Sequence, residues 1–132
     1  MSNQVPSVTT LALMERYMDG AVRRQVLRME NLAQLDTPGY KAKDIPFEKY
    51  MEELVATAEQ EGSSSAERVQ KSTEIPVPEP VGGLAVRPDQ NNVDLDQELR
   101  MISNNVSKFN VVAQVMQQKL KTLRTSINDQ RS

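Results

Sequence analysis

The sequence predicts an all-α protein in which two long terminal helices form an antiparallel, coiled-coil-like hairpin. Apolar residues recur every three or four positions near both ends of the chain, which is the spacing of one helix face. The stretch 61–92 lacks this periodicity and is rich in Pro, Gly and Ser, which favours a flexible linker or a small extended region. A chain of 132 residues has room for one domain with a flexible part.

The first long helix is expected over 10–36, after a flexible, polar leader at 1–9. The leader has no basic segment and no long apolar run, so we expect no cleavable signal peptide. Thr9 or Thr10 can cap the start of the helix. One predicted packing stripe follows from the spacing of three or four, and its members are Leu11, Met14, Met18, Val22, Val26 and Met29.

A turn and a short amphipathic helix are expected over 37–60. Pro38 fixes its own φ and disfavours helical geometry at Thr37, so the first helix should end just before it. Pro38 and Gly39 suit the two central positions of a type II turn, because the second position needs a positive φ. The chain then resumes a helical pattern to about residue 60.

The last segment, 93–132, gives the strongest helical signal. Steps of four and three alternate without a break, which is the 3.5-residue repeat of a coiled-coil seam. Asp94 is suited to cap the helix. Met101, Val111 and Val115 lie away from the seam, so the helix is expected to need a second neighbour. The predicted seam consists of Leu95, Leu99, Ile102, Val106, Phe109, Ala113, Met116, Leu120, Leu123 and Ile127.

Composition argues against several classes of function. The chain has no His and no Cys, which removes imidazole bases, thiolate nucleophiles and most zinc sites. Asp94 and Asp96 are two residues apart and do not share a helix face, so capping explains them better than a metal or acid–base pair. The net charge is −2, and no concentrated basic face is visible for a nucleic acid. We therefore expect no enzyme, no catalytic, cofactor-binding or metal-binding residue, and no small-molecule substrate.

Two short motifs carry a family resemblance. The first is the turn Asp36-Thr37-Pro38-Gly39-Tyr40-Lys41, which resembles a signature near the N-terminus of flagellar rod and hook proteins. The second is Asn91-Asn92-Val93-Asp94-Leu95-Asp96, which resembles the motif that opens their C-terminal helix. Their order, the helix that reaches the chain end and the short length are similar to the proximal rod proteins of the FlgB type. Gln34 and Leu35 depart from the small residues or Asn usual before the first motif.

The resemblance implies a structural subunit of the bacterial flagellar basal-body rod, built in the periplasm after synthesis in the cytoplasm. It implies export through the flagellar type III apparatus and self-association in a helical assembly. Implied partners are other rod subunits, the ring–rod junction protein of the FliE type and the export gate. The first motif would then fix where the chain leaves the coiled coil, with Tyr40 and Lys41 presented to a neighbouring subunit. The alternative hypothesis for the function is a cytoplasmic helical-hairpin adaptor or secretion chaperone.

Overall fold

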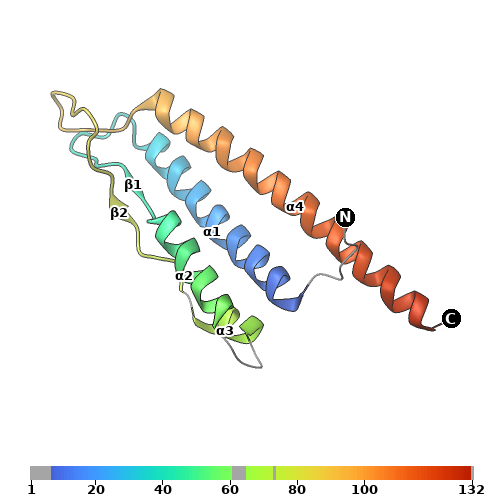
Figure 1. Ribbon diagram of the computed structural model, residues 1–132. Helices are drawn as coiled ribbons and strands as arrows, with labels where there is room; N and C mark the ends of the chain where they lie inside the picture. Colours follow the sequence, from blue (N-terminus) through green and yellow to red (C-terminus); the bar gives the residue numbers. More distant parts are fainter. Residues whose placement is uncertain (1–6, 61–64, 73, 132) are drawn as a thin grey trace.

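A computed structural model describes residues 7–60, 65–72 and 74–131, and this part of the chain is mainly helical. The helices are α1 (Val8–Ala33), α2 (Phe47–Glu59), α3 (Ser65–Ser72) and α4 (Leu95–Arg131) (Figure 1). Two short strands, β1 (Lys43–Asp44) and β2 (Glu79–Pro80), pair antiparallel with Lys43 opposite Pro80. The prediction of a mainly helical chain with two long terminal helices is confirmed. None of the described helices combines the length and the apolar character of a membrane-spanning segment.

Local signals in the sequence account for the limits of α1. The hydroxyl of Ser7, rather than that of Thr9 or Thr10, caps the helix by accepting a hydrogen bond from the Thr10 amide at 3.1 Å. Val8 and Thr9 therefore belong to the helix, and residues 1–6 of the predicted leader lie outside the described residues. After the helix, the Tyr40 amide donates to the Thr37 carbonyl at 3.3 Å and Gly39 has a φ of 75°. The type II turn at Pro38-Gly39 is thus confirmed.

The small hydrophobic core lies where α1, α2 and α3 meet. Its buried residues are Ala12, Tyr50, Leu54 and Val69. Gly20 on α1 is also buried, and a Cβ atom there would lie 2.8 Å from the Tyr50 ring. Glycine is therefore what permits α2 to lie close to α1, and this contact offsets the low helix propensity of Gly20.

The segment 61–92 was predicted to be a linker or a small extended region, and the structure corrects part of this prediction. Residues 65–72 form α3, whose Val69 is fully buried in the core. The helix was missed because eight residues with one large apolar side chain give no recognisable periodicity. Further along this segment, β2 pairs with β1 and the Val81 amide donates to the Ala42 carbonyl at 2.8 Å, whereas residues 87–90 form a turn closed by a hydrogen bond from the Gln90 amide to the Arg87 carbonyl at 2.8 Å. Residues 61–64 and 73 lie outside the described residues.

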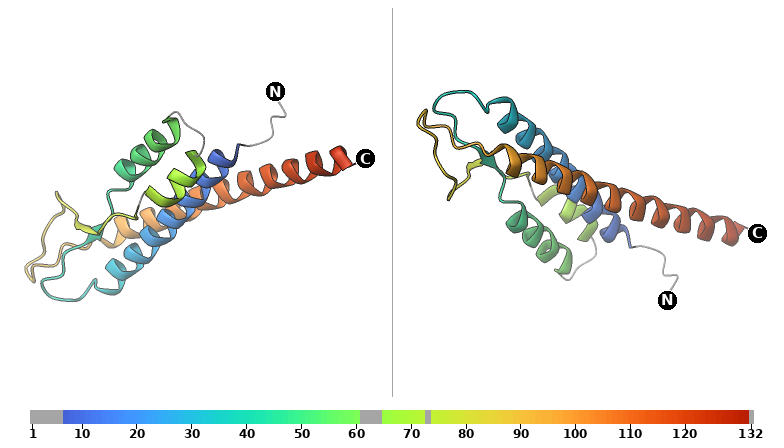
Figure 2. Two further views of the ribbon diagram at one scale, coloured as in Figure 1. Left: turned by 90° about the horizontal axis from the view of Figure 1, so that it is seen from below. Right: turned by 90° about the horizontal axis from the view of Figure 1, so that it is seen from above.

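Helix α4 runs antiparallel along α1 and then extends past the other helices. Its beginning contacts the end of α1 through Glu98 and Arg28, and Asn105 further along donates to the Ala21 carbonyl at 2.9 Å. Views from below and from above show the last turns of α4 projecting beyond α1, α2 and α3 (Figure 2). We call residues 116–131 the α4 overhang.

Candidate functional site

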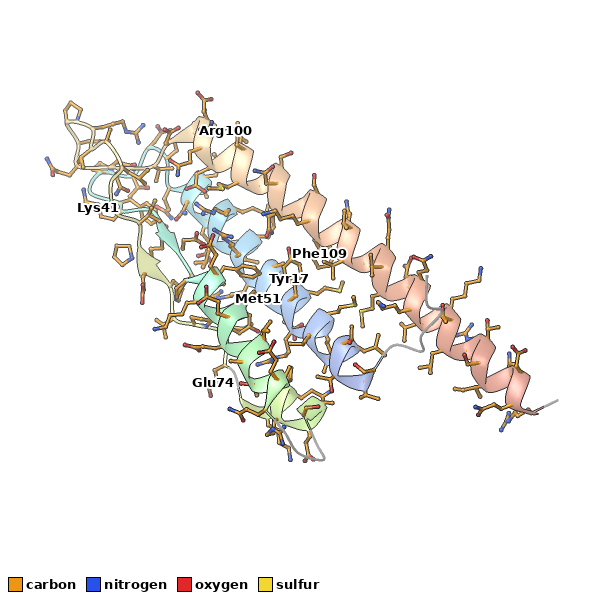
Figure 3. The ribbon with its side chains drawn as sticks, in the orientation of Figure 1. Tyr17, Lys41, Met51, Glu74, Arg100 and Phe109 are labelled. Atoms are coloured by element: carbon orange, nitrogen blue, oxygen red, sulfur yellow. The ribbon has the colours of Figure 1, made fainter. Side chains whose placement is uncertain are left out.

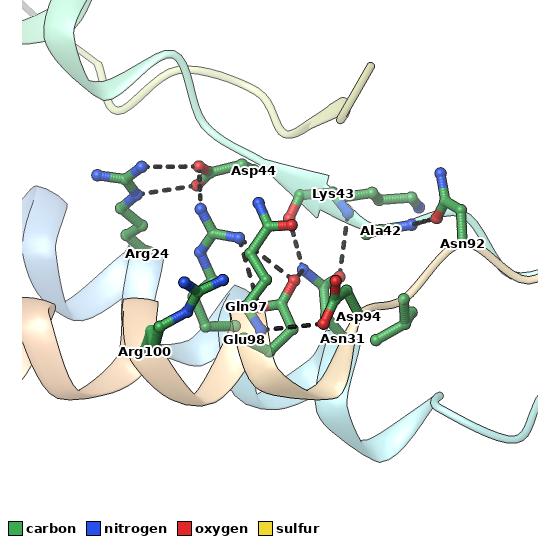
Figure 4. A network of polar contacts seen from close by, with 12 residues as sticks. Arg24, Asn31, Ala42, Lys43, Asp44, Asn92, Asp94, Gln97, Glu98 and Arg100 are labelled. Carbon is green, nitrogen blue, oxygen red and sulfur yellow. Dashed lines mark hydrogen bonds and ion pairs between the residues drawn. The ribbon is translucent and has the colours of Figure 1, made fainter. Parts of the chain in front are cut away.

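The two sequence motifs, which are about 50 residues apart in the chain, lie against each other in the structure. The Gly39 amide donates to the Asp89 carbonyl at 2.8 Å, and the Asn92 amide donates to the Tyr40 carbonyl at 3.2 Å. The Asn92 side chain in turn accepts from the Ala42 amide at 2.6 Å (Figure 4). We call this region the motif junction. It joins the end of α1 to the start of α4.

Asn91 satisfies the backbone at the end of α1. The last carbonyls of a helix have no partner within the helix and must find one elsewhere. The Asn91 amide group donates to the carbonyls of Gln34 and Thr37 at 2.9 and 2.8 Å, and its carbonyl oxygen accepts from the Val93 amide at 2.8 Å. The side chain is fully buried. One asparagine thus closes α1 and holds the segment that leads into α4.

Asn31, also fully buried, connects three elements beneath the junction. Its side chain exchanges two hydrogen bonds with the backbone of Lys43 on β1, donating at 2.8 Å and accepting at 3.0 Å. The Tyr40 hydroxyl donates to the same Asn31 oxygen at 3.0 Å. The amide group of Asn31 also donates to Glu98 on α4 at 3.3 Å (Figure 4). Together these hydrogen bonds of Asn31 fix the position of β1 relative to both long helices.

Two arginines and two carboxylates complete this polar interior. Arg24 binds Asp44 through two hydrogen bonds of 3.1 and 2.8 Å, and Arg28 bridges Asp44 at 2.6 Å and Glu98 at 3.3 Å. Arg28 and Glu98 are only 3% and 2% exposed. Burial raises the pKa of Glu98, and the Arg28 guanidinium partly opposes this by favouring the carboxylate. The four charges balance, as a buried ionic cluster requires.

This arrangement supports structure rather than chemistry on a substrate. The carboxylates of Asp44 and Glu98 form ion pairs with arginines of the same chain. The side chains of Asn31 and Asn91 form hydrogen bonds with the backbone, and Asn31 also binds Glu98. The buried Nε of Arg28 has no hydrogen-bond partner within the described residues, but the other polar groups of the network are paired and favour one arrangement of the elements that they join. Within the described residues, no group of three or more acidic side chains could hold a metal ion.

Tyr40 and Lys41 of the first motif were expected to be presented to a neighbouring subunit, and both side chains already have partners within the chain. Asp36, Thr37, Pro38 and Gly39 are exposed at the tip of the turn. Tyr40 and Lys41 are half-buried and bind within the chain: the Tyr40 hydroxyl reaches Asn31, and the Lys41 ammonium donates to the Gln90 carbonyl.

The second motif is divided between the interior and the surface. Asn91, Asn92 and Val93 are buried, whereas Asp94, Leu95 and Asp96 are exposed. The Asp94 carboxylate accepts from the Gln97 amide at 3.1 Å, so its predicted role as the cap of the C-terminal helix is confirmed.

The predicted packing stripes are not the faces buried within the chain. On α1, Leu11, Met14 and Met18 are half-buried and Val22, Val26 and Met29 are exposed. The buried residues of α1 are instead Ala12, Gly20, Ala21, Leu27, Arg28 and Asn31. The stripe on α4 stays partly or fully accessible in this chain: Ile102, Phe109, Ala113, Met116 and Leu123 are half-buried, and Leu95, Leu99, Val106, Leu120 and Ile127 are exposed.

Helix α4 turns a different face toward α1. Glu98, Asn105 and Val112 contact or border α1, and each lies one position before a seam residue. The seam is thereby rotated away from the middle of the contact. Between the two helices lies an apolar groove of about 220 Å³, which we call the α1–α4 groove. It is lined by Ala21, Val22, Gln25, Val26, Asn105, Val106 and Phe109.

Sequence reasoning overlooked the polar interior as a site. Arg24, Arg28 and Asn31 are spaced by four and three residues, so they occupy one face of α1. A polar row with this spacing, in a helix that also carries an apolar stripe, is the signal that could have predicted a second contact surface. Its partners, Asp44 and Glu98, could not be assigned without the tertiary structure.

The comparisons with known proteins fit this arrangement of helices and motifs. No family model matches the sequence. Flagellar basal body rod protein FlgB of Salmonella typhimurium (strain LT2) is 32% identical over 108 residues, covering 75% of this chain and 78% of the relative. The proteins of the same description from Yersinia enterocolitica and Yersinia ruckeri are 30% and 29% identical over 112 residues, covering 70% of this chain and 82% of each relative. An identity of this level over most of both chains places this protein in the FlgB family of flagellar basal body rod proteins.

Proposed function

We propose that this chain is a structural subunit of the proximal flagellar rod that polymerises through its two terminal helices. The observation that carries the proposal is the accessible seam of α4. Leu99, Leu120 and Ile127 on this seam are 48%, 45% and 50% exposed. A 3.5-residue apolar repeat with exposed members from one end of the helix to the other is suited to contacts with helices of other subunits.

The apolar stripe of α1 adds to the same surface. Val22 and Val26 are 52% and 41% exposed and line the α1–α4 groove together with Val106 and Phe109 of the seam. A groove between two helices accommodates a third helix by packing its side chains between the two rows. The pair of terminal helices therefore offers a neighbouring subunit one continuous site. The function of the predicted coiled-coil hairpin would then be to bind a helix of a neighbouring subunit.

Export and partners follow from the family rather than from the site. After synthesis in the cytoplasm, the chain would leave through the flagellar type III apparatus and take its place in the periplasmic rod. Its neighbours would be other rod subunits and the ring–rod junction protein of the FliE type, and it would meet the export gate on its way. The relatives' description as basal body rod proteins supports this placement.

A single seam variant tests polymerisation through the helices. Val106→Asp places a charge in the α1–α4 groove, where a docked helix would have to bury it, and burial of an unpaired charge is costly. We expect the variant to be lost from purified basal bodies and to abolish swimming, while the purified chain remains folded by circular dichroism. Ser107→Asp is the matched control, because Ser107 is the adjacent exposed residue off the seam. Normal incorporation of Val106→Asp would contradict the proposal.

A further inference from the structure

A second apolar groove lies between α2 and α4. It is on the side of α1 that faces away from Val22 and Val26. Both helices pack on α1, but in the described part of the chain they do not pack on each other. The space between them is a hollow of about 400 Å³ with an almost wholly apolar lining that includes Leu13, Met14, Tyr17, Met51, Val55 and Val112. Tyr17 and Met51 lie where α1 faces α2 (Figure 3). We call this hollow the α2–α4 groove.

The groove continues toward the motif junction, where the part of its wall formed by α2 carries negative charge. A neighbouring hollow of about 520 Å³ shares Tyr17 and Met51 with it, and Glu48 and Glu52 of α2 line this part. Helix α2 has four exposed glutamates and one lysine. Of the basic residues that line the rest of this hollow, Arg24 and Arg28 are bound to Asp44 and Glu98, and Lys108 lies on the α4 side, away from the glutamates of α2 in the sequence. The rim formed by α2 therefore favours a basic partner with an apolar stripe.

The α4 overhang has both properties. Met116, Leu120, Leu123 and Ile127 continue the seam along it, and it carries four basic residues and one acidic residue. Lys119, Arg124 and Arg131 occupy positions directly beside the seam, as the flanking charges of a paired helix do. At 1.5 Å per residue its 16 residues measure about 24 Å, and the 15 residues of the α4 wall from Met101 to Val115 measure about 23 Å.

We infer that the overhang of one copy of this chain occupies the α2–α4 groove of another copy. The overhang cannot fill the groove of its own chain, because α4 is one uninterrupted helix and its earlier part forms the groove wall. Overhang and groove are different surfaces, so the contact is heterologous and repeats from copy to copy, which produces a filament or a ring. The inference rests on the proposed function and assigns one of its subunit contacts.

Site-directed crosslinking tests the contact directly, because the chain has no cysteine of its own. Cells would produce one copy with Val55→Cys in the groove and one with Leu123→Cys on the overhang, and basal bodies would be oxidised and analysed for a crosslinked dimer. We expect the dimer with this pair. We expect none when Leu123→Cys is combined with Arg100→Cys, since the exposed Arg100 lies at the far end of α4 (Figure 3).

Charge reversal provides a second measurement. Glu52→Arg in the groove copy should lower the yield of the dimer about fivefold, and Arg124→Glu in the overhang copy should restore it, since exposed ion pairs have effects of this size. The inference is overturned if both cysteine chains are present in basal bodies and no Val55–Leu123 dimer forms, or if Leu123→Cys crosslinks only to another protein. Absence of the chain from basal bodies would instead contradict the proposed function.

Discussion

At and directly beneath the motif junction, Asn91 and Asn31 are completely buried, and polar side chains join α1, β1 and the start of α4. At the other end of the molecule, Leu120 and Ile127 on the α4 overhang remain 45% and 50% exposed. A soluble single-chain fold usually has the reverse distribution, with polar groups outside and aliphatic groups inside. The two ends therefore differ in kind: the junction fixes the geometry of one chain, whereas the proposed function assigns the exposed overhang to contacts with other chains.

The difference follows from what each kind of contact can specify. Hydrogen bonds and buried ion pairs are directional, and a wrong partner leaves a buried group unsatisfied, so they fix one arrangement of α1, β1 and α4. Apolar stripes are not directional and tolerate several neighbours of similar shape. In an assembly, a rigid junction can hold the angle between the terminal helices while their stripes meet other subunits.

The largest expected loss of stability comes from a substitution that breaks the buried ionic cluster next to the motif junction. Arg28→Ala leaves Glu98 as a buried charge without its ion pair, and removal of one member of a buried pair typically costs about 3–5 kcal/mol. Urea unfolding of the purified chain measures the loss. Arg23→Ala is the control, because Arg23 is an exposed arginine on the same helix and should change stability by less than about 0.5 kcal/mol. Equal effects of the two variants would show that the ionic cluster does not hold the helices.

The second largest loss of stability is expected when the hydrogen bonds of Asn91 to the end of α1 are removed. Asn91→Asp keeps the shape of the side chain but replaces the group that donates to the Gln34 and Thr37 carbonyls by an acceptor. We expect a loss of about 2–3 kcal/mol from the two unsatisfied carbonyls, together with faster amide exchange at the end of α1. Asn110→Asp, at an exposed position of α4, should be nearly neutral in the same unfolding experiment. Unaltered exchange in Asn91→Asp would mean that the two motifs are not coupled.

The smallest effect on stability is expected at the overhang. Ile127→Ser removes a half-exposed side chain and should change the free energy of unfolding of the isolated chain by less than about 0.5 kcal/mol. The same kind of substitution in the core, Leu54→Ser, should cost at least about 3 kcal/mol, since Leu54 is fully buried. Denaturant titrations of both variants compare the two environments. A large loss in Ile127→Ser would reveal a contact of the overhang within its own chain.

The sequence by itself determined the helical class, the two long terminal helices, the turn at Pro38-Gly39 and the cap at Asp94. These features depend on local physics: apolar periodicity, the fixed φ of proline, the positive φ open to glycine, and side chains that accept from nearby amides. The two motifs could also be recognised from their residues alone. Each of these signals is read over a few neighbouring positions and needs no knowledge of the rest of the chain.

Only the tertiary structure decided which faces are buried and what the motifs do. Periodicity gives the relative position of residues around a helix but not the absolute direction of a face, so it could not show that half of the stripe residues are half-buried and the other half are exposed in this chain. Helix α3 is held by Val69 and Ala66 against a core that distant segments supply and by a hydrogen bond between Ser65 and Thr9, and no local pattern in the sequence predicts it. Asn31, Arg28 and Glu98 meet because antiparallel packing brings together residues about 70 positions apart, and contacts between such distant residues leave no pattern in the sequence.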